Sequence, residues 1–199
     1  INEQTNEIKT SLLPRVFAIF LNQNQSPVLA NKEVREAINM VIDREKIIRE
    51  VLGGYGEVLF GPIPPSLIGL DKEIQYNNED RYEKAKEILT KGGWSYEETD
   101  RVWIKKTKKD SQVLTFSMST ANSEELVKVA ELIRQDLEKI GIISDIKSYD
   151  SGDLQQNIIR PRKYDTLLFG EVIGRDLDLY AYWHSSQRND PGYNVAMYT

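Results

Sequence analysis

The chain has 199 residues, of which 40% are apolar and 29% are charged, so it is long enough for one sizeable hydrophobic core in a globular protein. Its formal net charge of −5 is mixed along the sequence and argues against a nucleic-acid-binding surface, which needs clustered Lys and Arg. The chain has no cysteine, which excludes disulfides and cysteine-ligated metal sites, and no stretch approaches the roughly 18 apolar residues of a membrane span.

The first half of the chain predicts one strand and two helices. Residues 1–15 are polar and are expected to form a linker. The apolar run Val16–Leu21 then predicts a buried strand. Apolar residues at helical spacing predict a helix from the capping residue Asn31 to Val51, ended by Gly53-Gly54, and a second helix from Asp80 to Gly92.

The second half predicts a β-α-β-α-β unit. The predicted strands are Val113–Met118, Ile142–Tyr149 and Asp165–Phe169, and the predicted helices run from Asn122 or Ser123 to Gly141 and from Ser151 to Arg160. Right-handed crossovers turn such a unit into a parallel sheet with helices covering its faces, which is an α/β fold. In open sheets of this kind, ligands bind beyond the carboxyl ends of the strands. Because the third strand is expected to end at Gly170, the ligand is expected beside Gly170–Asp178.

Three other features are expected to have structural explanations. The only histidine, His184, would need Ser185 or Ser186 for a Ser-His-Asp arrangement, but sequence neighbours are not expected to face it and no G-x-S-x-G motif is present. We therefore expect His184 to be solvated or to pack. Gly53–Gly56 follows a helix rather than a strand, which predicts a helix end and a turn instead of a phosphate loop. The basic run Lys105–Lys109 is expected to be a solvated turn.

Carboxylates and aromatic residues surround the predicted ligand edge. Glu171, Asp176 and Asp178 could serve hydrolysis, cation binding or the binding of an ammonium group, and an ordinary surface loop explains their spacing equally well. The aromatic residues beside them are Tyr180, Tyr182, Trp183 and Tyr193. This set either packs in the core or lines a cleft for a ligand with apolar and polar parts.

Four stretches of the sequence occur in an order that resembles a known family. They are FLN (20–22) with KEVREAIN (32–39) and IDRE (42–45), VLGGYG (51–56) with GPIPP (61–65), AKEIL (85–89) with GGW (92–94), and LIRQDLEKIG (132–141) with YD (164–165) and GRDLDLYAYWHSSQ (174–187). Together they cover most of residues 16–199. The ordered set resembles the family 5 extracellular solute-binding proteins, which include oligopeptide, dipeptide and nickel-chelate binders.

The resemblance implies a periplasmic-binding-protein type II-like lobe, with a mostly parallel sheet and helices on both faces. Residues 16–199 would be the C-terminal lobe of a two-lobed protein, and residues 1–15 a tail derived from the hinge. The implied function is capture of a small solute, most simply a peptide, by lobe closure and its delivery to an ABC permease. The implied protein is an extracytoplasmic monomer, with an N-terminal lipid anchor outside this sequence and without catalysis, cofactor, metal or nucleic acid.

The resemblance also implies particular ligand contacts. The backbone of Gly170, Glu171 and Val172 would pair with an extended peptide, and Asp176 or Asp178 would bind its terminal ammonium group. Further contacts are expected from Asn22, Tyr180 and Arg160. Arg160 and Arg162 would either meet a ligand carboxylate or be solvated. Many relatives have Trp where this chain has Glu171, and the acidic residue indicates a changed preference, toward cationic ligands.

Two alternatives of other classes fit the same residues. A hydrolase acting on a peptide or a sugar would use Asp176, Asp178 or Glu171. A sensory or pheromone-binding module would use the same lobe without a transporter.

Overall fold

The computed structural model describes residues 15–59, 61–62, 80–107, 110–172 and 179–198. The strands are β1 (Arg15–Leu21), β2 (Ser95–Glu97), β3 (Val102–Lys106), β4 (Ser111–Val113), β5 (Thr115–Ala121), β6 (Ile143–Tyr149) and β7 (Thr166–Val172). The helices are α1 (Lys32–Val41), α2 (Arg44–Val51), α4 (Arg81–Lys91), α5 (Glu124–Glu138), α6 (Ser151–Asp153), the π-helical turn η1 (Leu154–Ile159), α7 (Leu179–Trp183) and the 3₁₀ turn η2 (Ser185–Gln187). The predicted tail, residues 1–15, lies outside the described residues apart from Arg15.

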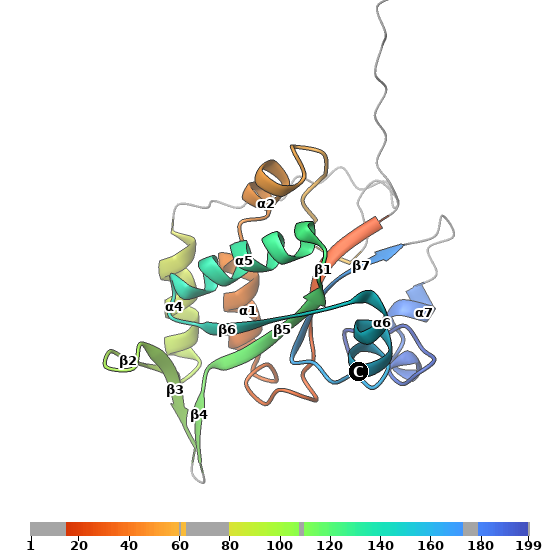
Figure 1. Ribbon diagram of the computed structural model, residues 1–199. Coiled ribbons are helices and arrows are strands. Elements are labelled where there is room, and N and C mark those ends of the chain that lie inside the picture. Colours follow the sequence, from red (N-terminus) through yellow and green to blue (C-terminus); the bar gives the residue numbers. More distant parts are fainter. Residues whose placement is uncertain (1–14, 60, 63–79, 108–109, 173–178, 199) are drawn as a thin grey trace, which may run out of the picture.

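The main sheet has four strands in the order β1-β7-β5-β6 (Figure 1). β5 is parallel to both β6 and β7, whereas β1 is antiparallel to β7 and pairs with it from end to end. The predicted mostly parallel sheet is therefore confirmed. A second, smaller sheet has the order β2-β3-β4 and is antiparallel.

Helices cover both faces of the main sheet, as predicted. Successive strand residues point to opposite faces, so that Leu168 of β7 packs in one core while Leu167 and Phe169 pack in another. The larger core joins the sheet to α1, α4 and α5, and the smaller one joins it to η1, α7 and the segment around Val195. In the described part of the chain, no helix is both long and apolar enough to cross a membrane.

The helix predicted over residues 31–51 is two helices, because the backbone leaves the helical conformation at Ile42 and Asp43. The Asp43 carboxylate accepts the Lys46 N–H at 2.9 Å and so starts α2. Asn31 precedes α1, but its amide group donates to the carbonyls of Pro27 and Val28 and does not cap the helix.

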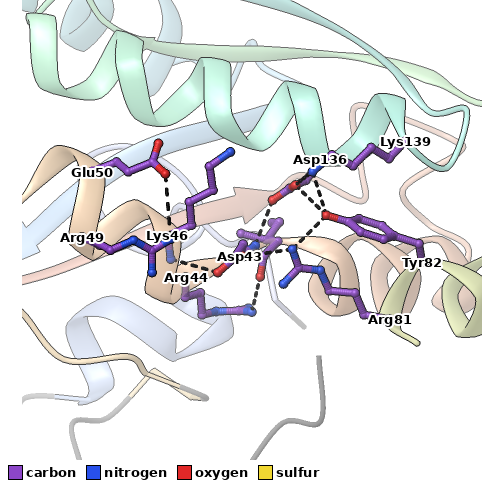
Figure 2. A network of polar contacts seen from close by, with 10 residues as sticks. Asp43, Arg44, Lys46, Arg49, Glu50, Arg81, Tyr82, Asp136 and Lys139 are labelled. Carbon is purple, nitrogen blue, oxygen red and sulfur yellow. Dashed lines mark hydrogen bonds and ion pairs between the residues drawn. The ribbon is translucent and has the colours of Figure 1, made fainter. Parts of the chain in front are cut away.

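A polar network fastens this break to α4 and α5 (Figure 2). Asp43 accepts from Arg81 at 2.9 Å through its carboxylate, and its N–H donates to Asp136 at 3.0 Å. The Tyr82 hydroxyl donates to Asp136, and Lys139 donates to both at 2.8 Å. The Arg81 side chain is only 10% exposed, so Asp43 is the carboxylate that balances a largely buried charge.

Electrostatics within the network favour the ionised form of Asp43. Burial by itself raises the pKa of Asp43, but the Lys46 N–H and the Arg81 guanidinium together outweigh it and hold the pKa below its ordinary value. The pair therefore stabilises the fold at neutral pH.

Lys105 and Lys106 of the basic run lie on β3 rather than in the predicted solvated turn, whereas Lys108 and Lys109 lie outside the described residues. Lys105 lies on β3, and its ammonium group contacts the Glu33 carboxylate at 2.6 Å, with a quarter of the Lys105 side chain exposed. The residues between α4 and β5 form the small sheet, which the Trp103 indole anchors by donating to the Ile140 carbonyl at 2.6 Å. The strand predicted over residues 113–118 is split at the buried Leu114 between β4 and β5.

Both helix ends predicted around α5 are confirmed. Ser123, rather than Asn122, caps it by accepting the Leu126 N–H at 3.4 Å. Gly141 follows its end with a φ of +78°, a conformation that glycine adopts without strain.

Candidate functional site

The carboxyl ends of the three parallel strands meet at one edge of the main sheet, which we call the carboxyl edge. It is formed by Ala121 at the end of β5, Tyr149 at the end of β6, and Phe169 near the end of β7, all partly buried against the smaller core. The Asn122 N–H donates to the Tyr149 carbonyl at 2.8 Å and continues the β5–β6 pairing by one residue. This is the edge at which the sequence predicts a ligand.

β7 runs beyond its partner at this edge and offers a backbone to a ligand. It reaches Val172, rather than ending at Gly170, because β1 pairs with it over the whole length. Its register with β5 stops at Leu168. Among the described strands, the side of β7 that faces away from β1 is therefore unpaired from Phe169 to Val172.

Two hydrogen bonds show which backbone groups point to this unpaired side. The Leu168 carbonyl accepts from the Thr120 hydroxyl at 3.0 Å, and the Val172 carbonyl accepts from the Tyr182 hydroxyl at 3.1 Å. Backbone groups of a strand alternate in direction with a period of two. The N–H and C=O of Gly170 therefore point to the same side, toward any strand added there.

Gly170 is required by its cross-strand neighbour. It pairs with Phe17, and a Cβ atom at position 170 would lie 2.7 Å from the Phe17 ring. That distance is shorter than van der Waals contact, so a larger residue would displace the ring or bend the strand. The ring itself is half exposed, on the face of the sheet opposite Glu171.

Glu171 is the one predicted carboxylate that the structure describes. It lies on the same face of β7 as Leu167 and Phe169, is only partly exposed, and has no hydrogen bond or ion pair with any described residue. Burial raises the pKa of Glu171 to about 7. Nearby, Tyr164 donates its hydroxyl to the Val195 carbonyl at 2.6 Å. Burial raises the pKa of Tyr164, Arg162 opposes this rise, and the charge of Glu171 adds to it.

The aromatic set divides between the core and the surface. Trp183 packs against the smaller core. Tyr180 is 56% exposed and stacks on the His184 ring at 4.4 Å, while Tyr193 is exposed and lies 5.8 Å from the Tyr182 ring. Core packing is therefore shown for Trp183, and the lining of a ligand cleft by the exposed tyrosines stays a prediction.

His184 packs and forms a helix cap. Its Nδ1 accepts the Ser186 N–H at 3.2 Å and lies 2.9 Å from the Ser186 hydroxyl. The expectation that Ser186 cannot face His184 is wrong, because His184 precedes η2 and its ring folds back over that turn. The Tyr180 hydroxyl also contacts the Ser186 hydroxyl, at 3.0 Å.

Asn22 has a structural role in this fold. Its side chain is 1% exposed; its amide group donates to the Arg162 carbonyl at 3.1 Å, and its oxygen accepts the N–H groups of Asn24 and Gln25. These contacts shape the turn after β1 and hold it to the loop before β7. We leave Asn22 out of the proposed ligand contacts for this reason.

Arg162 is neither a ligand contact nor solvated. It is 8% exposed, and its guanidinium donates to the carbonyls of Ile159, Arg188 and Gly192 at 2.6–2.9 Å. It therefore ties the end of η1 to the C-terminal segment, a role that no local sequence pattern indicates. Arg160, by contrast, is exposed and lies 3.8 Å from the exposed Asp190.

The remaining predicted site residues lie elsewhere. Asp176 and Asp178 are outside the described residues. A surface hollow on α4 is lined by Glu83, Lys86, Glu87, Thr90 and Lys91, an ordinary charged helix face. Within the described ranges, no three His, Asp or Glu side chains gather in a way that suits a metal ion.

The chain is similar to solute-binding proteins over almost its whole length. It is 28% identical to the oligopeptide-binding protein AppA of Bacillus subtilis over 93% of this chain, and 29% identical to the heme-binding protein A of Haemophilus influenzae over 69%. The solved structure of AppA in complex with a nonapeptide superposes on 95% of this chain with a TM-score of 0.81 and 27% identity. The structure of NikZ from Campylobacter jejuni with Ni(L-His), at 23% identity and a TM-score of 0.76 over 94% of this chain, shares the fold.

The matched region is only part of those proteins. This chain spans 34% of the AppA sequence, 23% of the heme-binding protein, 37% of the solved AppA chain and 36% of the NikZ chain. The family model described as "Bacterial extracellular solute-binding proteins, family 5 Middle" matches residues 2–194. The chain therefore belongs to the bacterial extracellular solute-binding proteins of family 5.

Proposed function

We propose that this chain is the C-terminal lobe of a two-lobed extracytoplasmic protein that captures peptides and presents them to an ABC permease. The observation that carries the proposal is the unpaired side of β7 from Phe169 to Val172, at the carboxyl edge of the sheet. The likeness to a peptide binder over most of the chain supports it.

The unpaired side of β7 suits an extended peptide. A peptide that adds a strand to a sheet edge gains affinity through main-chain hydrogen bonds, which do not depend on its sequence. Gly170 contributes backbone groups there, and Glu171 and Val172 flank it. In this proposal Asp176 or Asp178 binds the peptide's ammonium group. In this proposal the exposed Arg160 and Tyr180 contact the peptide's other end and its side chains.

Capture needs closure of two lobes and breaks no bond. A ligand that binds the closed form better shifts the open–closed equilibrium by its difference in affinity for the two forms. We therefore propose a binding protein rather than an enzyme. The protein would act as a monomer, with a lipid anchor on a segment preceding this chain.

The test is a calorimetric titration of the two-lobed protein with peptides of two to nine residues. We expect saturable binding, and we expect N-methylation of individual peptide nitrogens to weaken it about tenfold at the positions that pair with β7, because each removes a main-chain donor. Methylation at positions outside the paired segment is the control. Saturable binding of a metal chelate or a sugar, with none of any peptide, would overturn the peptide assignment.

A further inference from the structure

We propose that Glu171 is a specificity-determining residue that selects peptides carrying a cationic side chain, lysine or arginine, beside β7. The inference rests on the proposed function and adds the chemical class of the ligand.

The face of β7 that carries Glu171 is apolar before it, because Leu167 and Phe169 on the same face pack in the smaller core. The carboxyl edge next to it is made by Ala121, Tyr149 and Phe169, which pack against the smaller core. Its carboxylate is the one acidic group in the described part of β7. A side chain with an apolar stem and a charged end, as in lysine or arginine, matches an apolar surface with one carboxylate at its rim.

No described cation of this chain takes that position. Arg162 donates to three backbone carbonyls, and Arg160 faces Asp190. Arg15 lies over the Phe17 ring, 5.9 Å from its centre, on the other face of the sheet. The carboxylate is thus partly withdrawn from water without a partner among the described residues.

The lack of a described hydrogen-bond donor beside Glu171 favours a cationic ligand group over a neutral one. A partly buried carboxylate without a hydrogen-bond donor is less stable than one in water, and a ligand ammonium or guanidinium group restores both charge balance and hydrogen bonds. Burial raises the pKa of Glu171 to about 7, so part of the cost of its ionisation is open to relief by a cationic ligand. The charge of Glu171 also adds to the raised pKa of Tyr164, whose hydroxyl already donates to the Val195 carbonyl.

The experiment compares matched peptides on the two-lobed protein. One alanine-based pentapeptide series carries a single lysine at each position in turn, and the second carries norleucine, which keeps the apolar stem without the charge. We expect one lysine position to bind at least tenfold more tightly than its norleucine counterpart at pH 8. In Glu171→Gln that preference falls to less than threefold, while the norleucine peptides bind as to the wild type. Glu97→Gln, on exposed β2, is the control and keeps the preference.

The possible outcomes separate the two proposals. Equal binding of lysine and norleucine peptides to the wild type overturns the role of Glu171 and leaves peptide capture intact. An equal loss of both series in Glu171→Gln also overturns it, because it shows that the carboxylate positions the strand or the second lobe. Absence of binding by every peptide overturns the proposed function, and the inference falls with it.

Discussion

Replacing Glu171 by glutamine is expected to stabilise the unliganded chain at alkaline pH and to leave it unchanged in acid. The amide keeps the shape of the carboxyl group and removes its charge. Burial raises the pKa of Glu171 from 4.5 to about 7, so the folded state holds its proton more tightly than the unfolded state does. Ionisation therefore costs the folded state free energy. The cost is absent below pH 4.5, grows between pH 4.5 and 7, and is complete above pH 7.

The free-energy cost of ionising Glu171 in the folded state follows from the size of the rise in its pKa. Each pH unit of difference corresponds to about 1.4 kcal/mol, so the cost of full ionisation is about 3 kcal/mol at most. Glu171 is partly exposed, and solvent screening reduces this to about 1–2 kcal/mol. For a chain of 199 residues, a gain of that size raises Tm by about 2–6 °C.

Thermal and urea unfolding of the wild type and Glu171→Gln at pH 4 and pH 8 measure this difference. We expect the variant to be more stable by about 1–2 kcal/mol at pH 8 and equal within about 0.5 kcal/mol at pH 4. Glu97→Gln on exposed β2 is the control, with no difference between the two pH values beyond about 0.5 kcal/mol. Equal or lower stability of Glu171→Gln at pH 8 would refute the reasoning, because it would show that the fold gives the carboxylate a partner.

Three further substitutions test the structural features around the site. Asp43→Ala removes the carboxylate that balances Arg81 and the cap of α2, and a loss of about 3–4 kcal/mol is expected in urea unfolding at pH 7. Since the pKa of Asp43 is lowered, this contribution disappears as the pH falls below about 3.8. Arg162→Met leaves the carbonyls of Arg188 and Gly192 without their donor and removes one of the two donors to Ile159, so it should cost about 2–4 kcal/mol, with faster proteolysis of residues 185–198. Gly170→Val places a side chain against Phe17, and a loss of about 1–3 kcal/mol is expected, most of it recovered in the double variant with Phe17→Ala.

For each of these three substitutions, a control variant or an outcome that would contradict the expectation can be stated. Glu87→Ala breaks an exposed ion pair with Lys91 on α4 and should change stability by less than about 0.5 kcal/mol, whereas a similarly small effect of Asp43→Ala would contradict the network. For Arg162→Met, unchanged proteolysis of the C-terminal segment would contradict the role of Arg162 in holding that segment to the end of η1. For Gly170→Val, additive effects of the two substitutions would show that the Phe17 ring is not what excludes a side chain.

Patterns within a single element predicted the larger part of the fold. The apolar run Val16–Leu21 and the segments at 142–149 and 165–169 are strands, and the helical spacing over residues 123–141 gives α5. These elements have long, regular apolar patterns, so local sequence determines them. The stretches that resemble family 5 solute-binding proteins predicted the remaining arrangement, a lobe with helices on both faces of a mostly parallel sheet.

Features that depend on distant residues could not be predicted in this way. The break between α1 and α2 is held by Asp136, 93 residues further along the chain, and the small sheet is anchored where Trp103 meets the Ile140 carbonyl. Arg162 is buried where the carbonyls of Arg188 and Gly192, 26 and 30 residues further along the chain, meet the end of η1.

The candidate site also has features that the sequence predicts and features that depend on distant residues. The position of the carboxyl edge was predicted from the strand order expected of a β-α-β unit. The extension of β7 to Val172 could not be predicted from the sequence. It results from pairing with β1, and the residues near Gly170 do not encode the register of that pairing. That Glu171 has no partner among the described residues likewise depends on which side chains the fold brings near it.

β1 and β7 form a mechanically stiff pair. Seven consecutive residues of β1 are in register with seven of β7, with Arg15 opposite Val172 at the end where no described strand pairs with the other side of β7. A force that acts on the start of β1 along the strand direction is shared by all seven residue pairs at once, in shear. β7 therefore moves with β1 and does not separate from it one pair at a time. The tip of β7 would therefore follow axial motion of Arg15, and in the proposed binding mode this motion shifts the strand that pairs with the peptide.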